Sequence, residues 1–326
     1  MKRISNTVLF YSLSTLILAP IANAAETIAV IPIGAEQEAE QKRQALVKEN
    51  NFATVPRLEG GITASIGTFL AVPSSDLNSY YFSESGDDFT VLNVDPGSEY
   101  GFDVAFGYVF EHSANSVELL FRDINTSDNA SDDDRADTNL DYHLRALDLM
   151  LGQFMDLGQL VQLRFAAGIS YAELKRDQTT EITTDITNQT SEYSDYKGLG
   201  PRIGLDARYD FGQGFGIVGG GSLAYFLGKM KTNFSALSTT EVNLTNNNDD
   251  QAVMNFRGNV GVDYVYFFDN EQRSTAGIEF GYLIDYYDDS VRTVNTVAIP
   301  SPGTAQYETT AALSFAGPYL NLKAVF

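Results

Sequence analysis

The chain has 326 residues, of which 44% are hydrophobic and 12% aromatic, and its mean hydropathy is −0.14. Its formal net charge of −22 at pH 7 excludes nucleic-acid binding through neutralisation of phosphates. It contains no cysteine, which excludes disulfide bonds and thiolate metal sites.

The N-terminus has the pattern of an export signal. Lys2 and Arg3 precede an apolar run from Thr7 to Ile21, which is too short for a comfortable helical membrane span. Ala22-Asn23-Ala24 then supplies the small-x-small pattern that signal peptidase accepts. We predict that residues 1–24 are a cleaved signal peptide, and its loss takes the formal charge from −22 to about −24.

Residues 25–59 are expected to form a periplasmic tail, in which Ala35 to Asn50 is rich in helix formers and favours a short helix or a flexible segment. After the signal, no apolar stretch approaches 18 residues, so no spanning helix is predicted. A chain that crosses lipid without helices must satisfy its backbone hydrogen bonds in a closed barrel. A barrel formed by residues 60–326 would show the two-residue period of strands.

That period is clear from Phe102 onwards, where aromatic and aliphatic residues alternate with Asp103, Ala105 and Gly107. The same pattern recurs along the chain, with one change of register near Leu147 that suggests a β-bulge. The segments with this period are 61–72, 102–110, 117–122, 142–154, 161–171, 202–211, 215–225, 256–266, 277–284 and 309–326. About ten strands are predicted, and with the residues that flank these segments each is long enough to cross a bilayer at the usual tilt.

Short and long connections alternate between these strands. Short turns are expected near 111–115, 156–159, 212–214 and 269–273, and long loops at 73–99, 126–138, 175–196, 229–250 and 286–306. This asymmetry is typical of bacterial outer-membrane barrels, which have short periplasmic turns and long external loops. The sequence therefore predicts an all-β, antiparallel, up-and-down transmembrane barrel at the surface of a Gram-negative cell.

One face of nearly every strand is apolar, and the other carries glycine and charge, which cannot pack a dry core. We expect the apolar faces to contact lipid and the charged faces to line the lumen. The predicted lumen residues are Asp103, Glu118, Arg122, Arg145, Arg164, Arg202, Asp206, Arg208, Asp210, Arg257, Asp263 and Glu279. Phe326, with apolar residues two, four and six places before it, resembles the signal that the barrel assembly machinery reads in outer-membrane proteins.

The lumen allows two interpretations. Opposed rows of arginines and carboxylates suit a pore for small polar solutes, but the same residues can pair across the lumen and close it. Eight strands just fill with side chains and sixteen leave a channel, so ten lies between. The sequence leaves open a passive pore and a non-conducting surface protein whose loops bind lipopolysaccharide or host molecules. Oligomeric state is not determined by the sequence.

The external loops carry acidic clusters at 87–88, 132–134, 249–250 and 288–289, but none has the spacing of a defined cation loop, so no metal or other cofactor is predicted. Asp141 and His143 share one face of a strand, a pair similar to part of the omptin protease site. The second half of such a site has no clear counterpart, and His112 falls in a periplasmic turn. We expect no enzymatic activity, with an omptin-like protease as a remote alternative.

Several segments resemble the Legionella-type major outer membrane protein family. They are KGLGPRIGLDARYDFGQGFGIVGGGSLAYFLGK (197–229), HLRALDLMLGQF (143–154), LVQLRFAAGISYAEL (160–174) and TASIGTFLAV (63–72). The resemblance spans residues 60–326 and implies a surface-exposed barrel with porin activity, which in some members also serves attachment to host cells. The best-known relatives are disulfide-linked, and the lack of cysteine here excludes covalent oligomers.

Overall fold

The computed structural model describes residues 60–85, 88–94, 96–111, 113–132, 136–158, 160–183, 187–237, 241–268, 274–299 and 303–326. The predicted signal peptide, the tail at 25–59 and His112 lie outside the described residues. In the part that is described, no helix is long and apolar enough to cross a membrane.

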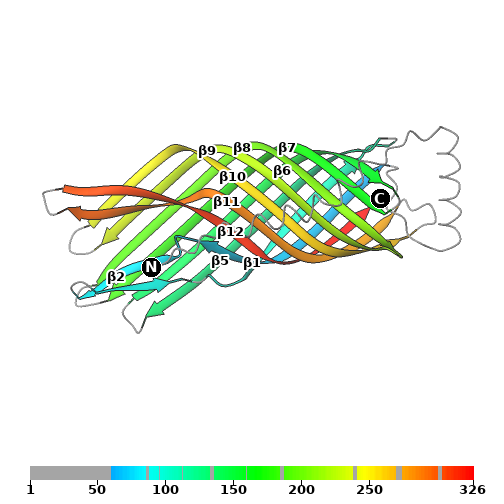
Figure 1. Cartoon of the computed structure of the whole chain (residues 1–326). Helices are drawn as coiled ribbons and strands as arrows, with labels where there is room; N and C mark the ends of the chain where they lie inside the picture. Colours follow the sequence, from blue (N-terminus) through cyan, green and yellow to red (C-terminus); the bar gives the residue numbers. More distant parts are fainter. Residues whose placement is uncertain are drawn as a thin grey trace, which may run out of the picture. The chain divides into compact units, whose positions relative to one another are not determined.

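Ten antiparallel strands close into a barrel, and two further strands form a small separate sheet (Figure 1). The strands are β1 (Gly61–Ser75), β2 (Ser79–Ser85), β3 (Asp88–Asn93), β4 (Glu99–Val109), β5 (Asn115–Asp132), β6 (Ala136–Leu157), β7 (Val161–Thr183), β8 (Thr187–Gly212), β9 (Phe215–Leu237), β10 (Glu241–Phe267), β11 (Thr275–Ile299) and β12 (Gly303–Val325). In the barrel each strand pairs with its neighbours in the sequence, β4 following β1, and β12 closes onto β1. The predicted up-and-down barrel of ten strands is confirmed.

The closing seam involves the last residue of the chain. The backbone NH of Phe326 donates to the carbonyl of Ile62 at 2.9 Å, and the NH of Ile62 donates to the carbonyl of Phe326 at 2.8 Å. The side chains of both residues are exposed on the barrel exterior. The C-terminal residue therefore completes the hydrogen-bonded ring that a barrel needs in order to leave no free edge.

The exterior of the barrel carries an apolar band. Exposed side chains such as Phe106 on β4, Ile203 on β8 and Val262 on β10 face outward, as the alternation predicts for a lipid-facing surface. Aromatic pairs lie near the short turns at one edge of this band, including Tyr209 with Phe211 and Tyr266 with Phe268. Such aromatic girdles mark a membrane interface, and short turns are typical of the periplasmic end of outer-membrane barrels.

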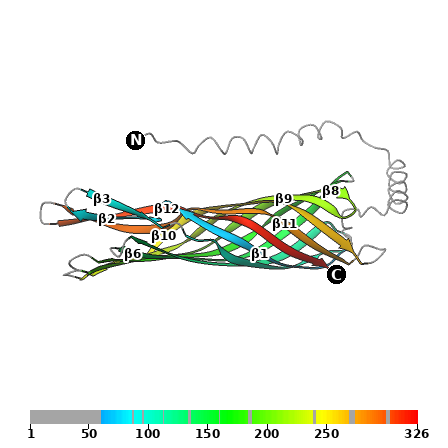
Figure 2. The same cartoon turned by 90° about the horizontal axis from the view of Figure 1, so that it is seen from below.

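The four short turns lie where the sequence predicts them, but most of the long loops do not exist as loops. The strands continue well beyond the apolar band and pair to the ends of the hairpins, for example from Thr183 of β7 to Thr187 of β8. The sequence conceals these extensions because both faces carry polar residues once the strand has left the lipid. The first long connection differs, because it contains β2 and β3 (Figure 2).

Candidate functional site

The lumen is the candidate site, and eleven of the twelve predicted residues line it. Near the short turns, two adjoining cavities of about 240 and 340 Å³ form a vestibule. Small inward residues such as Ser65, Ala105 and Gly204 leave this space, and charged side chains project into it. The vestibule opens at the periplasmic end, since residues beside the short turns and the barrel seam also line it.

Ion pairs neutralise most charges in the vestibule. Arg164 contacts Glu118 at 3.4 Å and Asp206 at 3.3 Å. Arg208 lies 2.7 Å from Asp263 and 2.8 Å from Asp210. Glu279 is paired with Lys323 and accepts a hydrogen bond from the Tyr319 hydroxyl. Among the described residues, Arg257 is the one predicted lumen arginine whose side chain makes neither an ion pair nor a hydrogen bond. This side chain lines the smaller cavity.

A second layer of ion pairs crosses the lumen above the vestibule. Arg122 on β5 lies 2.7 Å from Asp285 on β11, on the far side of the barrel. The same Asp285 accepts a hydrogen bond from Asn255 at 2.7 Å, and Asn255 accepts one from Arg202 at 2.8 Å. Arg202 also lies 3.4 Å from Asp148. This chain of contacts joins β5, β6, β8, β10 and β11 through the centre of the lumen.

Above these ion pairs the interior is closely packed, mainly by apolar side chains. Large side chains from the strands fill it, and each of those named here is at most 1% exposed: Phe69, Ile124, Leu140, Tyr142, Leu144, Leu174, Tyr196, Phe226, Tyr287, Leu313 and Phe315. Core packing of this kind leaves no room for a column of water. We call this group the lumen plug.

The connection between β1 and β4 adds to the plug. Val94 is buried within it, and its backbone NH donates to the carbonyl of Asn78 at 2.9 Å. The Tyr142 hydroxyl donates to the side chain of Asn78, and Arg176 donates to the carbonyl of Leu77 at 2.9 Å. The two ends of this connection are therefore fastened inside the barrel.

The plug also explains two wrong predictions. The sequence predicts Arg145 in the lumen, but it faces outward and pairs with Asp123 at 3.1 Å. No register shift interrupts β6 at Leu147, so the suggested bulge is also wrong. Because Leu147 faces lipid, strict alternation places Arg145 and His143 outside and Leu144 inside. Leu144, which looks lipid-facing in the sequence, is therefore part of the lumen plug.

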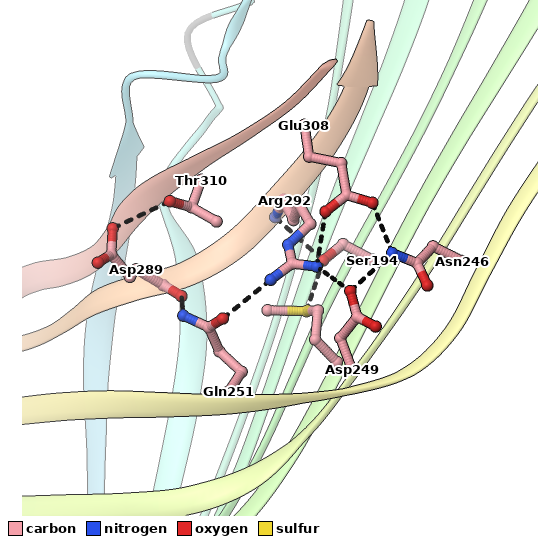
Figure 3. A network of polar contacts seen from close by, with 9 residues as sticks. Ser194, Asn246, Asp249, Gln251, Asp289, Arg292, Glu308 and Thr310 are labelled. Atoms are coloured by element: carbon pink, nitrogen blue, oxygen red, sulfur yellow. Dashed lines mark hydrogen bonds and ion pairs between the residues drawn. The ribbon is translucent and has the colours of Figure 1, made fainter. Parts of the chain in front are cut away.

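Beyond the plug, polar networks span the interior of the external hairpins. Arg176 lies 3.1 Å from Glu192, which accepts a hydrogen bond from Thr293 at 2.7 Å. Figure 3 shows a second network, in which Arg292 contacts Asp249 at 2.8 Å and Glu308 at 2.9 Å. The sequence does not predict these contacts, because it assigns most of their residues to loops.

The Asp141–His143 pair, considered as a remote catalytic alternative, and the acidic clusters at 249–250 and 288–289 have structural partners. The clusters at 87–88 and 132–134 lie, wholly or in their side chains, outside the described residues. Asp141 and His143 do share a face, but it is the exterior, and His143 contacts Asp123 at 3.4 Å. At the 288–289 cluster, Asp289 accepts a hydrogen bond from Thr310 at 3.2 Å. Within the described ranges, no group of three or more His, Asp or Glu side chains is arranged to hold a metal ion.

Solved structures that are similar to this chain share little of its sequence. No curated protein matches the chain. Solved structures with a similar course include the outer membrane protease OmpT of Escherichia coli, with 12% identity, a TM-score of 0.44 and coverage of 84% of this chain and 98% of that one. The translocator domain of the autotransporter NalP from Neisseria meningitidis has 14% identity, a TM-score of 0.37 and coverage of 94% and 99%. A major outer membrane protein from Thermus thermophilus has 9% identity, a TM-score of 0.34 and coverage of 82% and 99%.

The family is identified by a sequence model rather than by these distant structures. The model of the Legionella pneumophila major outer membrane protein precursor matches residues 54–326, which include the whole barrel. With its lipid-facing band and closed ring of strands, the chain is a barrel of the bacterial outer membrane, and it belongs to the Legionella major outer membrane protein family.

Proposed function

We propose that this protein is a closed barrel that works through the surface it presents outside the membrane, rather than a general diffusion pore. The lumen plug is the observation that carries this proposal. Side chains such as Phe226, Tyr287 and Phe315 are completely buried where a solute would have to pass. The ion pair between Arg122 and Asp285 crosses the lumen directly below them.

The external hairpins are suited to presenting a binding surface. They are continuous pairs of strands, and their interiors are tied together by Arg176 and Arg292 with their carboxylate partners. A surface held in one conformation loses less entropy when it binds a partner than a flexible loop does. Binding of lipopolysaccharide or of host surface molecules is therefore the proposed class of function, and no catalytic role is assigned to Asp141 or His143.

A small-solute pore is the second candidate, and the vestibule favours it. Its two cavities reach from the periplasmic end to the ion-pair layer and carry charges of both signs. Conduction then requires the plug to rearrange. A pore is the activity that the family resemblance implies, and a barrel that stays closed would not have this activity.

Swelling of proteoliposomes in isotonic arabinose or glucose separates the two candidates. We expect no sugar-dependent swelling with the wild-type protein. The variant F226A/Y287A/F315A removes three large side chains from the plug and is expected to admit small sugars, which shows that a path of this size would be detected. Circular dichroism and resistance to protease verify that both proteins are folded and inserted. Swelling of wild-type liposomes at a rate similar to that of the variant would establish the pore and reject the closed barrel.

A further inference from the structure

The hairpin of β11 and β12 leaves the barrel wall at its external end (Figure 1). β11 pairs with β10 only as far as Tyr287, and its register to β12 shifts between Tyr287 and Val291. Asp289 lies within this bulge and has a φ of 50°. A bulge bends the strand that carries it. Beyond the bulge, β11 pairs with β12 alone.

The other edge of this hairpin has no partner strand. β1 ends at Ser75, which pairs with Leu313, so residues Gly303 to Ala312 of β12 continue past the end of β1. In the part of the chain that the structure describes, β2 and β3 pair with each other and with no strand of the barrel. Ten residues of strand span about 33 Å. We call the backbone side that β1 leaves unpaired over residues 303–312 the β12 edge.

The alternation of the ladder shows which backbone groups point to the β12 edge. In an antiparallel pair, the NH and carbonyl groups of every second residue face the same neighbour. Phe326 exchanges both bonds with Ile62 of β1, and the register between the two strands is unshifted as far as the pair of Ser75 with Leu313. The even-numbered residues of β12 therefore face the β1 side. Past the end of β1, and among the described residues, the backbone groups on this side have no hydrogen-bond partner: those of Thr304, Gln306, Glu308, Thr310 and Ala312.

The β12 edge is unprotected but held in place. Natural sheets commonly guard an exposed edge with proline or lysine, and residues 303–312 contain neither. The hairpin rests on β8, because the backbone NH of Arg292 donates to the Ser194 hydroxyl at 3.2 Å and the Thr293 hydroxyl donates to Glu192 at 2.7 Å. A template that is already ordered loses little entropy when a partner binds.

The outward face beside the β12 edge is acidic. Figure 3 shows Thr310 donating to Asp289, at 3.2 Å, and Glu308 next to it on β12. In the described residues of the hairpin beyond the bulge, Arg292 is the one cation, and it is buried and already shared between Glu308 and Asp249. Four carboxylates are exposed around the edge: Asp76, Asp288, Asp289 and Glu308. The charge at this edge is therefore complementary to cations.

We propose that the β12 edge binds an extended, cationic polypeptide by strand addition. The peptide pairs with the free backbone groups of residues 304–312, and its lysines or arginines lie beside Asp288, Asp289 and Glu308. In this mode main-chain hydrogen bonds supply the affinity and alternate side chains supply the specificity. An anionic lipid or glycan does not fit, because the carboxylates repel it and it has no backbone to pair. The inference deepens the proposed function, since it names the chemistry of a partner for the external surface.

Hydrogen exchange tests whether the edge is open. The full-length protein is purified from outer membranes in detergent, and exchange is followed by mass spectrometry of peptic fragments. In the free protein we expect the amides of the even-numbered residues at 304–312 to exchange quickly, while the intervening amides, bonded to β11, exchange slowly. A decapeptide of alternating threonine and lysine is expected to protect the fast amides. Slow exchange of all these amides in the free protein would mean that this chain or a second copy already covers the edge, and would overturn the proposal.

The affinity of the same decapeptide, measured by thermophoresis, separates backbone pairing from charge. Methylation of every peptide nitrogen keeps the lysines but removes the donors, and is expected to weaken binding by on the order of a hundredfold, since several hydrogen bonds are lost together. A decapeptide of alternating threonine and glutamate is expected not to bind. Equal affinity of the methylated peptide would reject strand addition, and equal affinity of the glutamate peptide would reject a cationic partner.

Variants of the protein place the peptide at the β12 edge. In T310P one edge donor is lost while the bonds to β11 remain, because proline is tolerated where the NH points away from the sheet. We expect about a fivefold loss of affinity for T310P and none for T310V, which keeps the NH and lacks only the hydroxyl. An equal affinity of T310P and T310V would contradict the proposal.

A second pair of variants tests the acidic rim by charge alone. D288N and E181Q each remove one exposed carboxylate, but Glu181 lies on β7, on the opposite side of the barrel. Only D288N is expected to weaken binding, by about twofold. Equal effects of the two changes would overturn the assignment to this edge. Peptide binding does not depend on the state of the lumen, so it can fail while the swelling assay still supports a closed barrel, and the reverse.

Discussion

The ion pair across the lumen allows the sharpest test of the packing. Replacing Asp285 with alanine removes the partner that lies 2.7 Å from Arg122 and leaves Asp103, at 3.9 Å, as the nearest carboxylate in the described structure. The side chains of Arg122 and Asp285 are 3% and 1% exposed, so solvent cannot replace the lost contact. Breaking one partner of a buried pair costs about 3–5 kcal/mol, because the remaining charge stays buried without compensation.

The change also disturbs the polar chain around the pair. Asn255 loses its hydrogen bond to Asp285 but keeps one to the carbonyl of Tyr286 at 3.0 Å, so this contribution is smaller. We expect D285A to lower the free energy of unfolding by about 3–5 kcal/mol. Asp288, on the same strand, is exposed and accepts a hydrogen bond from the Tyr286 hydroxyl at 3.2 Å. The matched variant D288A is expected to cost less than about 1 kcal/mol.

Equilibrium unfolding in urea, with the barrel in lipid vesicles and followed by circular dichroism, gives these values. Circular dichroism is the appropriate probe because the chain has no tryptophan. The double variant R122M/D285L replaces both charges by apolar groups and is expected to recover most of the loss, since an apolar pair needs no compensation. A D285A protein within about 1 kcal/mol of the wild type would refute the reasoning, since it would mean that water reaches Arg122.

Three other predictions concern the ion pairs of Glu173 with Lys175 and Lys197, and the barrel seam. The pKa of Glu173 is lower in the folded protein than in the unfolded chain, where it is about 4.3. Its stabilising contribution is therefore present above the unfolded pKa and is lost as the pH falls through the lower folded pKa. The difference in unfolding free energy between wild type and E173Q should be constant from pH 7 to about 5 and shrink toward about pH 3. A difference that stays constant over the whole range would contradict it. A Cβ atom on Gly317 would overlap the carbonyl oxygen of Leu70, so G317A should prevent closure of β12 on β1. The yield of folded barrel, measured as the heat-modifiable band on gels, should fall. An unchanged yield would show that the seam can shift. Replacing Phe326 by aspartate should reduce insertion into the outer membrane of cells, measured by fractionation, while refolding in detergent continues; normal insertion would remove Phe326 as the assembly signal.

Much of the fold could be predicted because the lipid imposes a simple pattern. Residues such as Phe106 and Val262 must be apolar to face lipid, and their two-residue spacing identifies the strands directly. The short turns follow from the same periodicity. The signal peptide and the tail stay predictions, because they lie outside the described residues.

The state of the lumen could not be predicted, because it depends on contacts between residues that are far apart in the sequence. Arg122 is a visible lumen candidate, but its partner Asp285 is 163 residues away along the chain. Tyr142 and Leu144 look lipid-facing in the sequence because they are apolar, although apolar residues can also face a filled interior. The unbroken register through Leu147 shows that their face is the interior one. The sequence hides the external hairpins for a related reason, since strands outside the membrane no longer need an apolar face.

The central claim is that the lumen is closed between the vestibule and the cell exterior. Single-channel recording of the barrel in a planar lipid bilayer tests it most directly, with F226A/Y287A/F315A inserted under the same conditions as the opened reference. The closed barrel predicts a silent wild-type protein and discrete current steps from the variant. Salt-proportional steps from the folded wild-type protein would contradict the account and identify the vestibule as the entrance to a working pore.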